Sequence, residues 1–270
     1  MNGTPLACLF LLAACGLPGL ESPQYRLTPE FTLYQLTGNA RMQSESGGVR
    51  TDNDPVSARQ LGQDQRDAGD VGGTISVGDG FSGLDFSYLH VDVDGGTARG
   101  TLEQNFGSLQ AGDRVYSRLS GDEFKVSYFG KAYEHEWKSG AKVRLAPGFT
   151  LAHRDLSLRT TERNKARSQR IDLHDQVTPY LAVRARANWK LWAVNLDYAI
   201  DPGVHLGGSY EDILQDVALS LRYTALPDQD VDLIVGWRRF DLNASDSNDD
   251  LRWETKWKLD GFFFAVSIGF

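Results

Sequence analysis

Long hydrophobic runs are missing from this sequence. No internal segment approaches the roughly 20 consecutive apolar residues that a membrane-spanning helix requires. The mean hydropathy of -0.37 is too polar for a helical membrane protein. Basic charge is also scarce: the net charge is -8, which gives no reason to expect a nucleic-acid partner. A transmembrane β-barrel stays open as an architecture, because only every second residue of its strands faces lipid.

Cysteine is confined to one short segment. Cys8 and Cys15 both lie in the apolar N-terminal stretch, so disulfides, cysteine-ligated metals and cysteine nucleophiles are excluded from the rest of the chain. The sequence also contains no nucleotide-binding glycine loop, zinc-binding spacing or hydrolase nucleophile elbow. It therefore predicts no catalytic residue, no cofactor and no metal site, which favours a protein that is not an enzyme.

Residues 1–19 are typical of a secretion signal that is removed from the mature protein. The stretch from Leu6 to Gly16 is apolar but too short to span a bilayer as a helix. The stretch from Leu12 to Cys15 resembles a bacterial lipobox, which implies a lipidated Cys15 at the mature N-terminus. No Lys or Arg precedes it, which departs from the usual pattern. An ordinary signal peptide cut after Gly16 is the alternative.

The last ten residues alternate with a period of two. Phe262, Phe264, Val266, Ile268 and Phe270 fall on one face of a predicted strand, while the other face turns small. This pattern predicts a strand that meets lipid on one side. It resembles the closing strand of bacterial outer-membrane β-barrels, in which a terminal Phe and alternating hydrophobes are recognised during assembly. The resemblance implies an outer-membrane location, with outer-membrane lipid and the barrel-assembly machinery as partners.

The alternation recurs through residues 20–270 and predicts one antiparallel transmembrane barrel of about ten strands, with eight or twelve as alternatives. Along the chain, the connections between these strands alternate between long polar segments and short turns. If the chain starts and ends in the periplasm, every long segment lies outside the cell, as is usual for outer-membrane barrels. The long segments are 39–70, 94–121, 156–170, 201–212 and 241–250, and the short turns are 78–83, 138–141, 188–190 and 226–230.

One predicted strand changes its pattern part-way along. Leu84, Phe86 and Tyr88 share one face, whereas the apolar residues from Leu89 to Val93 have the opposite parity. Such a shift predicts either a β-bulge or the end of the membrane-embedded part of the strand.

A soluble barrel of the lipocalin type is the alternative architecture, with its apolar stripes facing inward around a ligand. Its exterior would be rich in Lys and Glu. Here the faces opposite the stripes carry small residues beside Arg, Asn and Asp, and aromatic residues stand at the stripe ends, as at membrane interfaces. The membrane barrel is therefore favoured. The predicted interfacial aromatics are Trp189, Trp192, Trp237, Trp253, Trp257, Tyr128 and Tyr223.

Histidine and acidic residues gather at a few places. Glu134-His135-Glu136 looks like a metal triplet, but on a strand its two Glu face away from its His. His153 and Asp155 belong to a set near the predicted outer rim. His/Asp sets at this height are similar to those of the omptin proteases, which are also ten-stranded barrels. The chain resembles these proteases in size and strand count, but no motif around these residues matches. The resemblance implies a hydrolase at the rim. Solvated rim residues are the alternative. The further members of these sets are Asp172, His174, Asp175, His90, Asp92, Asp94 and His205.

Charged residues are also expected inside the periplasmic half of the barrel. Burying unpaired charges is costly, so one interpretation is a plug of interlocked ion pairs. The other is a constriction that attracts anions. Because side chains fill barrels near eight strands, whereas open pores have sixteen or more, we predict a closed lumen with both acids paired to this basic set. The residues concerned are Arg144, Arg184, Arg186, Arg222 and Lys131, with the acids Asp85 and Asp232.

These features together favour a non-enzymatic outer-membrane protein, a surface scaffold with a side-chain-filled lumen whose outer segments meet an unknown extracellular partner. A narrow channel for small anions or solutes is the alternative, and an omptin-like hydrolase is the third hypothesis. The segments 39–70 and 94–121 are long enough either to form an external surface or to fold into the barrel mouth.

Overall fold

The computed structural model describes residues 24–46, 49–51, 54–63, 68–94, 100–131, 133–164, 166–202, 215–248 and 251–270. Within these ranges, the side chains of 43–46, 49–51, 68–69, 173–176, 242–248 and 251–252 are not described. The predicted signal segment with Cys15 lies outside the described residues, as does His205.

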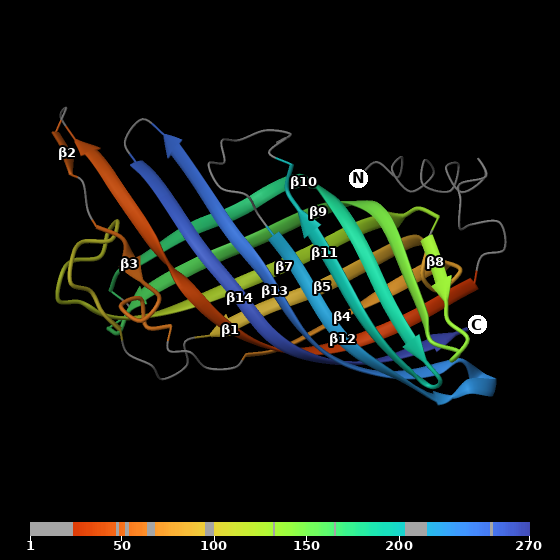
Figure 1. The fold of residues 1–270 in the computed structure, drawn as a ribbon. Coiled ribbons are helices and arrows are strands. Elements are labelled where there is room, and N and C mark those ends of the chain that lie inside the picture. The colour runs from red at the N-terminus through yellow and green to blue at the C-terminus, as the bar shows by residue number, and fades with distance from the viewer. Residues whose placement is uncertain are drawn as a thin grey trace, which may run out of the picture.

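Ten antiparallel strands form one closed ring, which confirms the predicted barrel and its strand number (Figure 1). Each strand pairs with the next around the ring, and β14 closes the ring on β1 with a register from Arg26↔Gly269 to Ser44↔Leu251. The ring strands are β1 (Gln24–Ser46), β4 (Ala68–Gly78), β5 (Gly83–Asp94), β7 (Arg114–Phe129), β9 (Lys142–Glu162), β10 (Ser168–Trp189), β11 (Trp192–Ile200), β12 (Gln215–Leu226), β13 (Val231–Asn248) and β14 (Leu251–Gly269).

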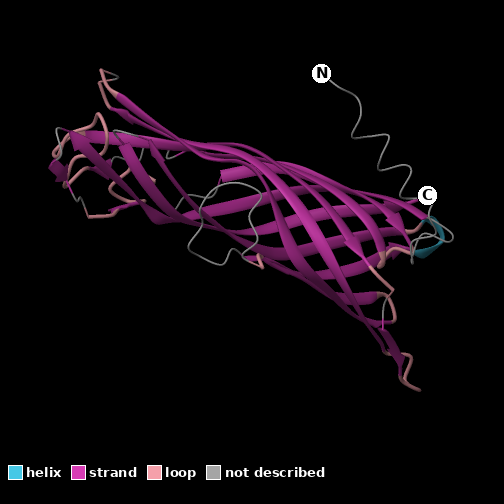
Figure 2. Ribbon diagram, turned by 90° about the horizontal axis from the view of Figure 1, so that it is seen from above, coloured by secondary structure: helices cyan, strands magenta, loops and turns pink. Residues whose placement is uncertain are grey.

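Shorter elements lie beside the ring. They are β2 (Val49–Thr51), β3 (Val56–Ser57), β6 (Gly100–Thr101), β8 (Tyr133–Glu136) and the 3₁₀ turn η1 (Pro227–Gln229). Figure 2 shows the ring as a long tube whose strands run obliquely to its length. Among the described residues, no helix is long and apolar enough to cross a membrane.

An apolar belt surrounds the half of the tube that carries the start of β1 and the end of β14. On β14, Phe262 and Phe264 are 63% and 54% exposed, and Val266 and Ile268 follow on the same face. Each of the other nine ring strands adds exposed hydrophobic side chains to this face. A continuous apolar exterior of this size is stable only against lipid. The apolar stripes therefore face outward, and the lipocalin-type alternative is wrong.

Beyond the belt, the pattern of β14 inverts. Its outward positions become charged from Asp260 onward, with exposed Lys258 and Lys256, while the inward Leu259 and Trp257 are completely buried. A polar exterior around an apolar interior is the arrangement of a barrel in water. The ring thus continues out of the membrane on the extracellular side, as a part that we call the tower.

The same inversion explains the change of parity in β5. Tyr88 points outward into the belt, whereas Leu89, Val91 and Val93 point inward and are at most 4% exposed. The register of β5 with β4 and β7 is unbroken, so no bulge is present there. Of the two predicted explanations, the end of the membrane-embedded part is correct.

The tower has an apolar core that fills its interior. Parts of two long connections complete this core, since Leu61, Leu102, Phe106 and Leu109 are at most 1% exposed. The side-chain amide of Gln63 donates to the backbone carbonyls of Val93 and Ser117, at 3.3 and 2.7 Å, and so fixes the first connection to the wall. The described connection residues, 54–63 and 100–113, therefore fold into the barrel mouth, whereas 39–46, 68–70 and 114–121 belong to ring strands. The ring strands supply Tyr34, Leu36, Met42, Leu89, Val91, Val93, Val115, Leu119, Leu156, Leu158, Ile171, Phe240, Trp257 and Leu259.

Several predicted boundaries are wrong for this reason. Most of 156–170 and of 241–250 is strand, because β9, β10, β13 and β14 run on into the tower. Their outward residues there are polar, which made these stretches look like loops. At the opposite end, β7 stops at Phe129, and the segment expected to continue it forms the separate strand β8, which pairs with the start of β9.

Trp257 corrects another prediction. Trp253 and Trp257 were expected in an interfacial girdle, but Trp257 is fully buried in the tower core and Trp253 packs against that core. Gly38 makes room for the Trp257 ring: a Cβ at Gly38 would lie 2.9 Å from a ring carbon, and its φ of +143° suits glycine alone. The close approach of β1 and β14 thus depends on a residue without a side chain.

The apolar belt gives a direct test of location. Folded protein should migrate faster on a detergent gel when unheated than when boiled, and it should fractionate with outer membranes, because the closed ring resists detergent and the belt requires lipid. Recovery from the periplasm as soluble protein without detergent would contradict the membrane location.

Candidate functional site in the barrel lumen

The lumen inside the apolar belt is crossed by charged side chains at two levels. We call the level nearer the periplasm the floor and the next level the middle layer. The tower core lies above both. Because inward positions recur at every second residue, one strand contributes to several levels.

Arg184 is the centre of the floor. It donates from Nη2 to Asp85 Oδ2 at 2.6 Å and from Nε to Asp197 Oδ1 at 2.8 Å, and its guanidinium lies 3.9 Å from the centroid of the Phe129 ring. Five N–H donors in a fixed planar fork make arginine suited to two carboxylates at once. The predicted pairing of Asp85 with the inward arginines is confirmed.

Asp232 joins two arginines on the other side of the floor. Its Oδ2 lies 2.8 Å from Arg26 Nη1 and 3.2 Å from Arg222 Nη1. Thr224 donates its hydroxyl to Oδ1 at 2.8 Å. The residue is only 3% exposed, so its predicted pairing is confirmed in a buried setting. Arg26 also reaches Asp230, at 2.5 Å.

The sequence predicted more inward arginines than acids, and the structure supplies the missing acids from unexpected places. Arg144 pairs with Asp79 of the β4–β5 turn at 2.5 Å and with Glu134 of β8 at 3.3 Å. Arg186 donates to the side-chain oxygen of Asn195 at 2.6 Å. Lys131 was expected inside, but it lies past the end of β7 and is exposed, so that prediction is wrong.

The β4–β5 turn closes the floor. Asp79 Oδ1 accepts the amides of Phe81 and Ser82, at 2.8 and 2.5 Å, which folds the turn back into the tube. Phe81 is 1% exposed, and its ring centroid lies 4.6 Å from the Arg144 guanidinium and 5.1 Å from that of Arg186. Burial raises the pKa of Asp79, but these amides and Arg144 outweigh it and hold the pKa below its usual value. The turn therefore keeps its charge at neutral pH.

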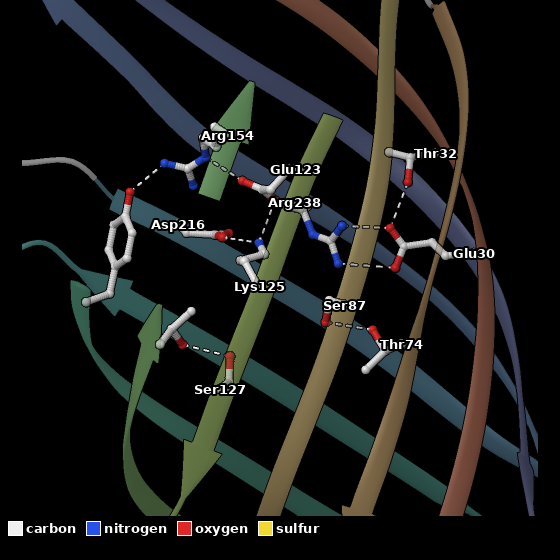
Figure 3. A network of polar contacts seen from close by, with 12 residues as sticks. Glu30, Thr32, Thr74, Ser87, Glu123, Lys125, Ser127, Arg154, Asp216 and Arg238 are labelled. Carbon is white, nitrogen blue, oxygen red and sulfur yellow. Dashed lines mark hydrogen bonds and ion pairs between the residues drawn. The ribbon is translucent and has the colours of Figure 1, made fainter. Parts of the chain in front are cut away.

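The middle layer crosses the lumen from wall to wall (Figure 3). Arg154 donates from Nε to Glu123 Oε2 and from Nη1 to the hydroxyl of Tyr180, each at 2.5 Å. Lys125 bridges Glu123 Oε1 at 2.8 Å and Asp216 Oδ2 at 2.5 Å. The Arg154 and Glu123 side chains are 2% and 1% exposed, so the pair is removed from water. These side chains come from β7, β9, β10 and β12 and thus join distant parts of the ring.

A second part of the middle layer links β13 to β1. Arg238 donates to both oxygens of Glu30, at 2.7 and 3.1 Å, in the bidentate geometry that is the strongest for arginine. Thr32 donates its hydroxyl to the same carboxylate at 2.8 Å. The pair connects residues 208 positions apart in the chain.

A polar cavity of about 120 Å³ lies between the floor and the middle layer. Asp85 and Arg184 line it from the floor, and Lys125, Asp216 and Arg238 line it from the middle layer. This is well above the roughly 10–15 Å³ that one water molecule requires, so the cavity has room for several. The cavity can therefore hold water but does not amount to an open pore.

The histidine and acid sets predicted from the sequence do not meet inside the barrel where they are described. His153 and Asp155 lie on the outward face of β9 and are exposed. The side chains of His174 and Asp175 are not described. Asp172 pairs with Arg170 at 2.6 Å. In the parts of the chain that the structure describes, no group of three or more His, Cys, Asp or Glu could hold a metal ion.

His90 and His135 also lie on outer faces. His90 Nδ1 lies 2.9 Å from Asp122 Oδ1, a partner that the sequence did not indicate. Asp92 pairs with Arg118 across the sheet. His135 packs edge-to-face on Trp137 at 4.6 Å. Its neighbour Glu134 points the other way, to Lys142 and Arg144, as the strand geometry predicted.

The sequence reasoning missed the middle layer as a whole. Its six members are charged residues at inward positions of five different strands, and no short motif marks them. The available signal is their parity: each except Arg154 falls between two lipid-facing apolar residues of its own strand, or one step beyond the last of them, whereas Arg154 lies three positions beyond Leu151. The members are Glu30, Glu123, Lys125, Arg154, Asp216 and Arg238.

A closed ring of ten tilted strands with an apolar belt and periplasmic termini defines a transmembrane β-barrel of the bacterial outer membrane. The protein resides in that membrane, as its closing strand predicted.

No known protein family and no curated protein matches the sequence. Among solved structures, the chain is similar to the outer membrane protease OmpT from Escherichia coli, with 12% identity and a TM-score of 0.48 over 91% of this chain and 97% of that one. It is also similar to a Pseudomonas aeruginosa FadL homologue (9%, 0.35, 96% and 93%) and to Ail, the attachment invasion locus protein of Yersinia pestis (7%, 0.26, 90% and 98%). At such identities and TM-scores, no activity transfers from these proteins.

Proposed function

We propose that this protein is a non-conducting outer-membrane scaffold that presents its tower to an extracellular partner. The observation that carries the proposal is that floor, middle layer and tower core each fill the lumen in turn. Phe81 and the arginines of the floor face the periplasm, and apolar side chains such as those of Leu61 and Trp257 fill most of the opposite end. A filled interior is expected for a barrel close to eight strands.

The proposal predicts an electrically silent barrel. Purified protein, shown to be folded by its heat-dependent migration, should give no conductance steps in planar bilayers, whereas a porin in the same bilayers gives them. The Phe81→Ala variant should also stay silent, because the middle layer and the tower core remain in place. Ohmic steps from the wild-type protein would contradict the scaffold and favour the narrow channel.

A further inference from the structure

Arginine side chains line up across three neighbouring strands on the outside of the tower. In the register of the sheet, Arg118 of β7 lies opposite Arg159 of β9, which lies opposite Arg170 of β10. All three are exposed. Four residues further from the membrane, the exposed Arg114 and Arg163 meet, since the amide of Arg163 donates to the carbonyl of Arg114 at 2.8 Å. We call these five residues the arginine rungs.

The arginine rungs are only partly neutralised by the protein itself. Arg118 pairs with Asp92, and Arg170 pairs with Asp172 at 2.6 Å. The other three arginines form no ion pair with any side chain that the structure describes. Like charges directly opposite each other destabilise a sheet. Asp94 also lies opposite Arg118 in the register of β5 and β7. In a chain of net charge -8, five exposed arginines gathered on neighbouring strands still make a local positive surface.

The height of the arginine rungs indicates what can reach them. Arg118 lies six residues beyond Phe124, the last exposed apolar residue of the belt on β7. At about 3.3 Å per residue and a tilt of about 40°, this is roughly 15 Å above the hydrocarbon. A phospholipid headgroup layer is only about 5–8 Å thick. Asp122 and Asp155, which lie opposite each other between the belt and the rungs, repel anions at the membrane surface.

Arg118, Arg159 and Arg170 lie on the side wall of the tower, while Arg114 is the first residue of β7 and Arg163 lies in the β9–β10 turn. A side wall at this height faces the headgroups of the surrounding outer leaflet. We therefore infer that the arginine rungs bind the anionic saccharide headgroup of a glycolipid in that leaflet, of the lipopolysaccharide type, through its core phosphate or carboxylate groups. Arginine suits this ligand because its planar fork binds such groups in bidentate fashion. The inference goes beyond the scaffold proposal, since a conducting barrel would carry the same surface.

The test compares two double variants in detergent micelles. Arg159→Gln with Arg163→Gln removes two rung charges that make no described ion pair. Lys256→Gln with Lys258→Gln removes two exposed charges on β14, which pairs with none of the rung strands. Each protein is titrated with lipopolysaccharide that has a complete phosphorylated core and with lipid A that lacks the core. Folding is checked by heat-dependent migration.

We expect the arginine variant to bind the complete lipopolysaccharide at least about tenfold more weakly than wild type, because each charge-assisted contact contributes about that factor. The lysine variant should bind it like wild type, and lipid A should bind all three proteins equally. Equal binding of the complete glycolipid by both variants would overturn the inference. Each protein is also titrated with dextran sulfate, and a loss of binding confined to this soluble polyanion would overturn the inference as well. An equal loss for lipid A would move the site to the membrane surface and overturn it too.

Discussion

Replacing Asp232 with Ala should lower the free energy of unfolding by roughly 3–5 kcal/mol, the usual effect of removing one partner from a buried ion pair. The substitution leaves Arg26 and Arg222 facing each other in the floor without the carboxylate that joins them, and it removes the acceptor of the Thr224 hydroxyl. Urea unfolding of the barrel in micelles measures this change. The middle layer and tower core still fill the lumen, so bilayer current should stay absent.

Asp230 offers a matched control, because it pairs with the same Arg26 but its side chain is 48% exposed. Its φ is +49°, so Asn is the suitable replacement. An exposed ion pair contributes at most about 1 kcal/mol, and Asp230→Asn should therefore unfold almost like wild type. If Asp232→Ala is as stable as Asp230→Asn and conducts anions, the floor is a hydrated constriction and the scaffold proposal fails.

Deleting Phe270 should reduce the folded yield in cells far more than the yield of refolding into detergent. We propose that this residue is read by the barrel-assembly machinery. In the finished barrel its ring is 77% exposed and stacks on Tyr25 at 6.2 Å. Its contribution to packing is therefore below the ~1.5–3 kcal/mol of a fully buried apolar side chain, so refolding should change by less than about twofold.

Phe262→Ala is the control for this deletion, since Phe262 lies on the same outward face of β14 and is 63% exposed. It removes a similar lipid contact but leaves the end of the strand intact. In cells, the folded yield of the Phe270 deletion should be clearly lower than that of Phe262→Ala. Equal losses for the two variants, in cells and in detergent, would mean that Phe270 matters for lipid contact alone.

The membrane-embedded part of the fold could be predicted from the sequence because lipid imposes one simple rule on it. Every outward position is apolar, so β14 is visible from Phe262 to Phe270 in the bare sequence. The tower follows the opposite rule, and stretches such as 156–170 then have polar residues where the belt has apolar ones. The change of apolar parity within β5 was the one sign of the tower that the sequence reading found. A single strand of this kind cannot distinguish a β-bulge from a change of environment.

The floor was partly predictable and the middle layer was not, for a related reason. Asp85 and Asp232 could be assigned to the depth of the inward arginines from strand direction alone. The pair of Glu30 and Arg238 joins the first and the ninth ring strands, and it depends on the shear of the closed ring. Strand shear sets which residues share a height, and periodicity along one strand contains no information about it.

The inversion between belt and tower fixes the vertical position of the barrel relative to the bilayer. A shift of the protein by two residues toward the periplasm would bring the charges of Asp260 and Lys258 into contact with hydrocarbon, which is unfavourable at any depth beyond the interface. A shift the other way would bring Phe262 into water. Because the ring strands that continue into the tower make this transition, namely β1, β5, β7, β9, β10, β13 and β14, the molecule has one depth at which it is stable, and it cannot adapt to a thicker membrane by sliding. Outer membranes of different hydrocarbon thickness should therefore deform around this protein, with the lipid adjusting to the barrel.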